Sequence, residues 1–183
     1  ILPEDIGSCY EIMKEQTAKK VKGKIKLVRR GDRRKGGIHH TPYDLIEYMV
    51  NASFPKKNGT KTPIFCDLAV GAGAFLIECS REINKRTGEP IRQILERNTI
   101  GFDVDRDVLK VAAYCFHLVA GCPTKPLRIN LHSGDSLKGY NSRKRIKDRI
   151  AELCPNGKEN TLIVLGNPPY VGVKLSEYEK YKL

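Results

Sequence analysis

Short apolar runs alternate with segments of helical periodicity along most of this chain, and this alternation constrains the fold more than any other feature. The predicted strands are residues 63–68, 99–102, 127–131 and 161–165. The predicted helices are residues 41–52, 73–86, 91–97, 106–120 and 143–153. Because parallel strands joined by helices form right-handed crossovers, the pattern predicts an α/β fold with a doubly wound, mostly parallel sheet. Ligands of such sheets bind beyond the carboxyl ends of the strands.

Ahead of the first predicted strand, the sequence divides into an N-terminal extension and the start of the α/β domain, with the boundary near residue 36. Residues 4–20 have the amphipathic pattern of a helix. Residues 22–37 mix basic, apolar and glycine residues, which is typical of a basic arm or hairpin. For the helix at 41–52, Thr41 is the predicted N-cap and Pro42 the first helical residue. Its predicted apolar face consists of Leu45, Ile46, Met49 and Val50.

Basic residues outnumber acidic ones, 33 to 21, which gives a formal net charge of +12. This excess favours a polyanionic partner such as nucleic acid, since bound phosphates release counterions. The basic residues gather at 19–35 and 143–149, with a smaller group at Lys56, Lys57 and Lys61. A solvated helix face is the alternative interpretation of residues 143–149.

The cysteines lie at positions 9, 66, 79, 115, 122 and 154, and no pair has the two-residue spacing of a zinc site or redox motif. Cys66, Cys79 and Cys115 lie in apolar stretches and are predicted to be small core residues. These features favour a reducing, cytoplasmic location. No apolar run is long enough to cross a membrane, so no membrane partner is expected. The residue spacing likewise gives no reason to expect a metal site.

A segment rich in small residues follows the first predicted strand. It begins at Asp67 and continues through Ala69, Gly71 and Gly73, which would let a ligand approach the backbone closely. A dinucleotide-binding fingerprint would require a third glycine where Leu76 stands. Asp67 would repel phosphate groups but suits a cationic ligand, such as the amino group of a methionine moiety. A helix N-terminal charge or a loop cap is the alternative role for Asp67.

Carboxylates also follow the next two predicted strands. Asp103 stands at the end of the second strand, where a carboxylate can accept hydrogen bonds from both ribose hydroxyls. Asp105 instead suits the N-cap of the helix that begins near Arg106. Asp135 follows the third strand and could accept a hydrogen bond from the amino group of an adenine ring. An ordinary turn residue is the alternative for Asp135.

The fourth predicted strand ends at Asn167-Pro168-Pro169-Tyr170. Each proline keeps the preceding residue out of the α region, so this segment is expected to be a rigid, extended turn. It would present an amide side chain, a backbone carbonyl and an aromatic ring at one place. These groups suit a planar base that carries an amino group, although a proline-rich turn after a core strand is the alternative. None of the four histidines is assigned to catalysis.

Taken in order, these motifs resemble those of adenine-specific DNA methyltransferases that use S-adenosylmethionine, of the Asn-Pro-Pro-Tyr class found in restriction–modification systems. The likeness spans about residues 36–173, from His39-His40-Thr41-Pro42 to the Asn-Pro-Pro-Tyr segment. It implies a Rossmann-like methyltransferase fold with an N-terminal helical and basic extension at 1–36 and a partial catalytic domain at 37–183. Leu68-Ala69-Val70 departs from the Pro-Ala-Cys common in the family, and residues 86–98 lengthen the path between the first two strands.

The resemblance also implies roles for individual residues. The implied catalytic residues are Asn167, Pro168, Pro169 and Tyr170. The implied cofactor-binding residues are Thr41, Pro42, Asp67, Ala69, Gly71, Gly73, Phe75, Asp103 and Asp135. The implied partner is double-stranded DNA with a flipped adenine, together with restriction or specificity subunits or domains.

The family's remaining strands and target-recognition domain are expected to follow residue 183. The chain is therefore predicted to be inactive alone and to self-associate through the exposed edge of its fourth strand. Two alternatives remain open at this point. One is a methyltransferase that acts on RNA guanine or protein glutamine, and the other is a non-catalytic fragment that binds cofactor or DNA.

Overall fold

The computed structural model describes residues 3–21, 24–29, 41–55, 62–136, 148, 151–152 and 161–168. Its centre is a four-stranded parallel sheet with the strand order β5-β4-β3-β6. The strands are β3 (Ile64–Asp67), β4 (Thr99–Asp103), β5 (Leu131–Ser133) and β6 (Leu162–Val164). The strand order reverses at β3, which pairs with β4 on one side and β6 on the other. The predicted doubly wound α/β fold is therefore confirmed.

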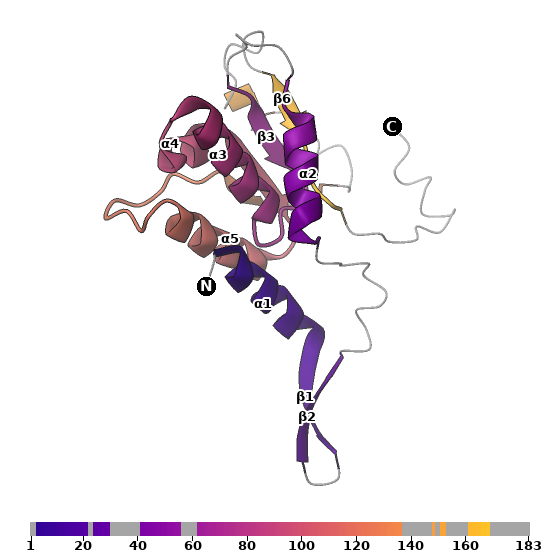
Figure 1. Cartoon of the computed structure of the whole chain (residues 1–183). Coiled ribbons are helices and arrows are strands. Elements are labelled where there is room, and N and C mark those ends of the chain that lie inside the picture. Colours follow the sequence, from indigo (N-terminus) through magenta and orange to yellow (C-terminus); the bar gives the residue numbers. More distant parts are fainter. Residues whose placement is uncertain are drawn as a thin grey trace.

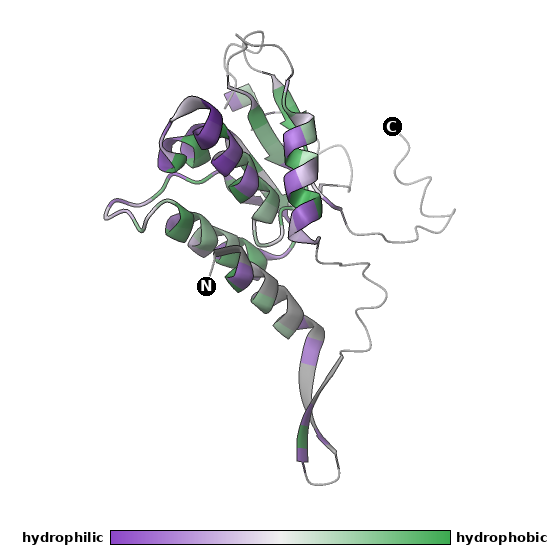
Figure 2. Cartoon of the chain, in the orientation of Figure 1, coloured by the Kyte–Doolittle hydropathy of each residue, from purple (hydrophilic) through white to green (hydrophobic). Residues whose placement is uncertain are grey.

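Helices α2 (Tyr43–Ser53), α3 (Ala74–Thr87), α4 (Ile91–Arg97) and α5 (Arg106–Val119) surround the sheet, and α3 lies along β3 (Figure 1). β3 is buried along its whole length, as expected for a central parallel strand. Figure 2 shows that β3 and β6 are hydrophobic while α3 has a hydrophilic side. The largest fully buried side chains include Phe65, Phe116, Ile46, Leu76 and Ile77.

The bounds of α4 agree with the prediction, and those of α3 and α5 agree within one residue at each end. The apolar face of α2 is confirmed at Ile46 and Val50, which are buried, and Met49 packs against the core. Leu45 was predicted on that face, but it is 46% exposed. Cys66, Cys79 and Cys115 are buried in the core, as predicted.

The predicted strand at 127–131 is wrong in its bounds, because β5 begins only at Leu131. Leu127 and Ile129 pack against the core, which explains the strand-like alternation. The side chain of Asn130, however, donates hydrogen bonds to the carbonyls of Glu96 and Thr99. Pairing with β4 starts one residue later, where Gly101 aligns with Leu131.

The N-terminal extension forms α1 (Pro3–Glu15) and a hairpin of antiparallel strands, β1 (Gln16–Val21) and β2 (Lys24–Arg29). The predicted helix at 4–20 therefore ends too late, since β-branched Thr17 and Val21 join the hairpin instead. A hairpin was expected, but it begins earlier than residue 22. Figure 1 shows α1 beside α5 and the hairpin extending beyond it.

Several predictions fall partly outside the described residues. Asp148, Ala151 and Glu152 are helical, and the other residues of the predicted helix at 143–153 lie outside, as do Lys56, Lys57 and Lys61. β6 is an edge of the described sheet, and Leu162 and Val164 are exposed there. Self-association through this edge stays a prediction. No helix within the described ranges is long and apolar enough to span a membrane.

Candidate active site

The carboxyl ends of β3 and β6 bring Asp67 next to the segment that starts the Asn-Pro-Pro-Tyr motif. Cys66 aligns with Val164 across the two strands, and the amide of Leu165 donates a 2.9 Å hydrogen bond to the Cys66 carbonyl. Gly166 follows directly, and a Cβ atom at this position would collide with the Asp67 carboxylate. Because Gly166 has no side chain, the backbone just before Asn167 can lie against the Asp67 carboxylate.

Asp67 is a buried carboxylate at the carboxyl end of β3. Only 1% of the residue is exposed, and Oδ1 accepts a 2.9 Å hydrogen bond from the amide of Ala69. Oδ2 is buried and has no hydrogen-bond partner among the described residues. Burial raises the pKa of Asp67 to about 7, the charge of Asp103 adds to the rise, and the Ala69 amide opposes it. A ligand that brings a cation or an N–H donor would satisfy this oxygen.

The loop between β3 and α3 is held against the end of β4. The amide of Val70 donates to the Phe102 carbonyl at 2.9 Å, and the amide of Gly71 donates to Asp103 Oδ2 at 3.0 Å. Gly73 has a φ of +91°, and the ring of Phe116 occupies the space where a Cβ would lie. The loop therefore keeps its small residues close to both Asp67 and Asp103.

Asp103 accepts hydrogen bonds from two loops, one with each carboxylate oxygen. Oδ2 accepts from Gly71, and Oδ1 accepts a 2.9 Å hydrogen bond from the amide of Asp105. Each carboxylate oxygen has two acceptor sites, so Asp103 can also accept from ligand hydroxyls. Asp105 caps α5, as predicted, because it accepts from the amides of Asp107 and Val108.

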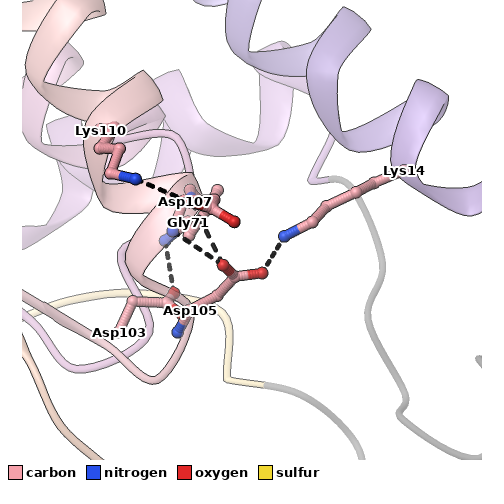
Figure 3. A network of polar contacts seen from close by, with 7 residues as sticks. Lys14, Gly71, Asp103, Asp105, Asp107 and Lys110 are labelled. Atoms are coloured by element: carbon pink, nitrogen blue, oxygen red, sulfur yellow. Dashed lines mark hydrogen bonds and ion pairs between the residues drawn. The ribbon is translucent and has the colours of Figure 1, made fainter.

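Lys14 of α1 pairs with Asp105, and Figure 3 shows it reaching the carboxylate beside Asp103 and Gly71. Burial alone would raise the pKa of Asp105, but Lys14 and the α5 amides lower it overall. Gly7 of α1 also packs so closely against Ala72 that a side chain at Gly7 would collide with it. Helix α1 is thus attached to the loop and to the start of α5.

The segment after β5 reaches the same edge of the sheet. The amide of Gly134 donates a 2.9 Å hydrogen bond to the Asp103 carbonyl, and Ser136 Oγ donates to the Leu68 carbonyl at 2.6 Å. Asp135 lies between these two anchors and is half-buried. The structure thus brings Asp67, Asp103 and Asp135 to one edge, where Asp67 ends β3, Asp103 ends β4 and Asp135 follows β5.

Thr41 contacts Asn167, although 126 positions separate them in the sequence. Asn167 Nδ2 donates a 2.9 Å hydrogen bond to Thr41 Oγ1. The predicted N-cap role of Thr41 is wrong, because Pro42 occupies that position and no side chain caps α2. A residue before proline prefers an extended conformation, so Thr41 lies outside the helix.

The first turn of α2 is fixed by Tyr43. Its hydroxyl donates to Glu78 Oε2 on α3, and Arg81 lies 3.6 Å from the same carboxylate oxygen. Burial, together with the hydrogen bond to Glu78, raises the pKa of Tyr43 to about 12. These contacts anchor the segment that carries Thr41.

The other predicted site residues either lie away from the carboxylates at this sheet edge or fall outside the described residues. Phe75 is 5% exposed and belongs to the core, and Pro168 is exposed. Pro169, Tyr170, His39 and His40 lie outside the described residues. Three neighbours of the site were not predicted from the sequence: Gly166, Ser136 and Lys14. A glycine that ends a strand is a signal of close backbone approach, whereas nothing in the sequence marks Lys14 or Ser136.

No protein-family model and no curated protein matches this chain. Among solved structures, the DrdV–DNA complex aligns with a TM-score of 0.55 and 18% identity, over 82% of this chain and 16% of that one. The M protein of the type I restriction enzyme EcoKI aligns with a TM-score of 0.50 and 17% identity, over 75% and 26% of the chains. The ATP-dependent type ISP restriction–modification enzyme LlaBIII, bound to DNA, aligns with a TM-score of 0.51 and 18% identity, over 77% of this chain and 11% of that one.

This chain thus spans about a quarter or less of the length of these structures. At such low identity the likeness shows the fold. The chain has a Rossmann-like α/β fold in common with these structures.

Proposed function

We propose that this protein transfers a methyl group from S-adenosylmethionine to the exocyclic amine of adenine in DNA, within a restriction–modification system. The observation that carries the proposal is the pairing of two features at one sheet edge. The buried carboxylate of Asp67, whose Oδ2 has no hydrogen-bond partner among the described residues, lies against Gly166. The next residue, Asn167, donates a hydrogen bond from its side-chain amide to Thr41. Fold likeness to the M protein of EcoKI and to DNA-bound LlaBIII supports this proposal.

The residues at this edge fit S-adenosylmethionine. Asp67 Oδ2 would accept a hydrogen bond from the α-ammonium group, and the small residues Ala69, Gly71 and Gly73 would let the cofactor approach the backbone. Asp103 would hold the ribose hydroxyls, and Asp135 would accept from the adenine amino group of the cofactor. When bound, the cofactor supplies an electrophilic methyl group on its sulfonium.

Thr41 determines how Asn167 would meet the substrate base. Asn167 Nδ2 donates to Thr41 Oγ1, which orients the amide and leaves the acceptor Oδ1 available to the substrate. Oδ1 and the carbonyl of Pro168 would accept the two hydrogens of the adenine amine. This arrangement would direct the nitrogen lone pair toward the methyl group, and it would be set up before the reaction.

The target base must leave the DNA duplex to reach this edge. Tyr170 would stack on the flipped base, and such contacts contribute about 1–3 kcal/mol per base. Because the base and the cofactor would be held together at this edge, their reaction would need no further loss of entropy on encounter. The basic net charge of +12 favours a nucleic acid over a protein glutamine as substrate.

Substitution of Asn167 tests the proposal. In a longer, active form of the protein that contains this chain, Asn167→Ala should lower the methylation rate by about a hundredfold, the scale for a lost transition-state hydrogen bond. Calorimetry should give nearly unchanged affinity for S-adenosylmethionine. Asn51→Ala is the matched control, since Asn51 is an exposed asparagine on α2.

The product should be N6-methyladenine, identified by mass spectrometry of digested DNA. RNA and protein substrates assayed in parallel test the alternatives. Methylated guanine or glutamine would refute the adenine proposal. A normal methylation rate in Asn167→Ala would refute the catalytic role of this segment.

A further inference from the structure

The hairpin of β1 and β2 is an exposed, basic, two-stranded ribbon outside the candidate site. Its six-residue strands pair from Gln16 with Arg29 to Val21 with Lys24. At about 3.4 Å per residue, each strand is about 20 Å long. Figure 1 shows the ribbon projecting beyond α1, on the side of the domain toward which β3 runs. This is the side of the candidate active site.

Both faces of the ribbon carry positive charge. Lys24 and Lys26 lie two positions apart and therefore share one face, while Lys20 aligns with Ile25 on the other. All four residues are exposed, and Ile25 is 79% exposed. None of these lysines forms an ion pair with a residue that the structure describes.

The pairing register is unfavourable for the ribbon by itself. It aligns Lys19 directly with Lys26, and like charges opposite each other destabilise a strand pair. A two-stranded hairpin without further packing is also only marginally stable in water. A polyanion that covers the ribbon would offset both effects.

The ribbon is joined to the candidate site through α1. Helix α1 ends at Glu15, and β1 begins at the next residue. The same helix packs against the cofactor-binding loop at Ala72 and pairs with Asp105 through Lys14. A duplex that presents a base to Asn167 would therefore meet the ribbon at a fixed position relative to the site.

We propose that the hairpin docks in the major groove of double-stranded DNA beside the target base, with Lys20, Lys24 and Lys26 at the phosphates. The major groove of B-DNA admits a two-stranded ribbon, whereas the deep and narrow major groove of an RNA duplex does not. The proposal rests on the proposed function for its substrate. It adds a DNA-binding element that lies outside the catalytic edge.

Fluorescence anisotropy with a DNA duplex of about three helical turns tests this proposal, measured across about 0.05–0.3 M salt. The triple variant Lys20→Gln, Lys24→Gln and Lys26→Gln should bind more than tenfold more weakly at about 0.1 M salt. Its salt slope should fall by about 2–3, since each lost phosphate contact removes about 0.9. The matched control is Lys85→Gln, Lys110→Gln and Lys125→Gln, which removes the same charge from exposed lysines elsewhere.

The control should bind as the unaltered chain does, within about twofold, because it changes no proposed phosphate contact. Replacing the three hairpin lysines by arginine should preserve both affinity and slope. A duplex whose major groove is blocked by glucosylated hydroxymethylcytosine should bind more weakly than the same unmodified sequence.

Equal losses in the hairpin and control variants would refute the proposal, as would tighter binding to an RNA duplex of the same length. Unchanged binding by the hairpin variant would refute only the role of the ribbon. Absence of DNA binding by the unaltered chain would contradict both the ribbon and the DNA substrate of the proposed function.

Discussion

Replacing Asp67 with asparagine should stabilise the unliganded protein at neutral pH while weakening cofactor binding. Asparagine has nearly the same shape and can still accept the hydrogen bond from the Ala69 amide through its oxygen. It cannot ionise, however, and so it avoids the cost of a buried charge whose Oδ2 has no partner among the described residues. The protein would keep this costly carboxylate because the cofactor needs it.

The magnitude follows from the pKa of Asp67, which burial raises from 3.8 to about 7. The folded state holds this proton more tightly than the unfolded state does. The resulting stability is complete below about pH 4 and is lost as the pH rises to about 7. At about 1.4 kcal/mol per pH unit, the whole loss is about 4 kcal/mol, of which about 2–3 kcal/mol falls between pH 5 and pH 8.

Urea unfolding followed by circular dichroism measures this difference. The free energy of unfolding of Asp67→Asn, minus that of the unaltered protein, should grow by about 2–3 kcal/mol from pH 5 to pH 8. Asp44→Asn controls for the loss of one negative charge, since Asp44 is exposed on α2. Calorimetry at pH 8 should show S-adenosylmethionine binding weakened by about 1.5–3 kcal/mol, as for a lost hydrogen bond to a charged group.

A stability difference that stays constant from pH 5 to pH 8 would refute the reasoning. It would mean that ionised Asp67 is already satisfied in the unliganded fold. Unchanged cofactor affinity in Asp67→Asn, with the fold intact, would remove Asp67 from the cofactor site.

Two further substitutions probe the site. Thr41→Val removes the acceptor for Asn167 Nδ2 while keeping the shape of the side chain, so the methylation rate should fall about three- to tenfold, the scale of one ordinary hydrogen bond. Its cofactor affinity should stay within about twofold, and Thr41→Ser should restore the rate; a normal rate in Thr41→Val would contradict this positioning role. Asp103→Ala should weaken S-adenosylmethionine binding by about 1.5–3 kcal/mol and should also lower stability, because the amides of Gly71 and Asp105 lose their acceptor. Unchanged affinity by calorimetry, in a variant with a native circular dichroism spectrum, would exclude Asp103 from the cofactor site.

Several features of this fold could be predicted from the sequence because they depend on neighbouring residues. The helical periodicity of residues 91–97 defined α4 correctly, and the Pro90 before it marks its start. Asp105 was predicted as an N-cap, and its side chain accepts hydrogen bonds from amides only two and three positions away. The apolar run before Asp67 predicted a strand at residues 63–68, which β3 (Ile64–Asp67) confirms.

Strand pairing limited the other predictions of secondary structure. Residues 127–131 alternate like a strand, but the register with β4 places β5 at Leu131–Ser133. Residues 16–20 could continue α1 by their polarity pattern, yet pairing with β2 makes them a strand. A hydrogen-bond partner that lies in another strand cannot be read from local periodicity.

The sequence by itself therefore determined which residue types stand at the ends of the strands, including Asp67, Asp103, Asp135 and Asn167. Only the tertiary structure decided what those residues contact. Thr41 had the local pattern of an N-cap, but the packing of α2 placed its hydroxyl against Asn167. The raised pKa of Asp67 likewise arises because the sheet and Gly166 exclude water from its carboxylate, and burial of this kind depends on segments far apart in the sequence.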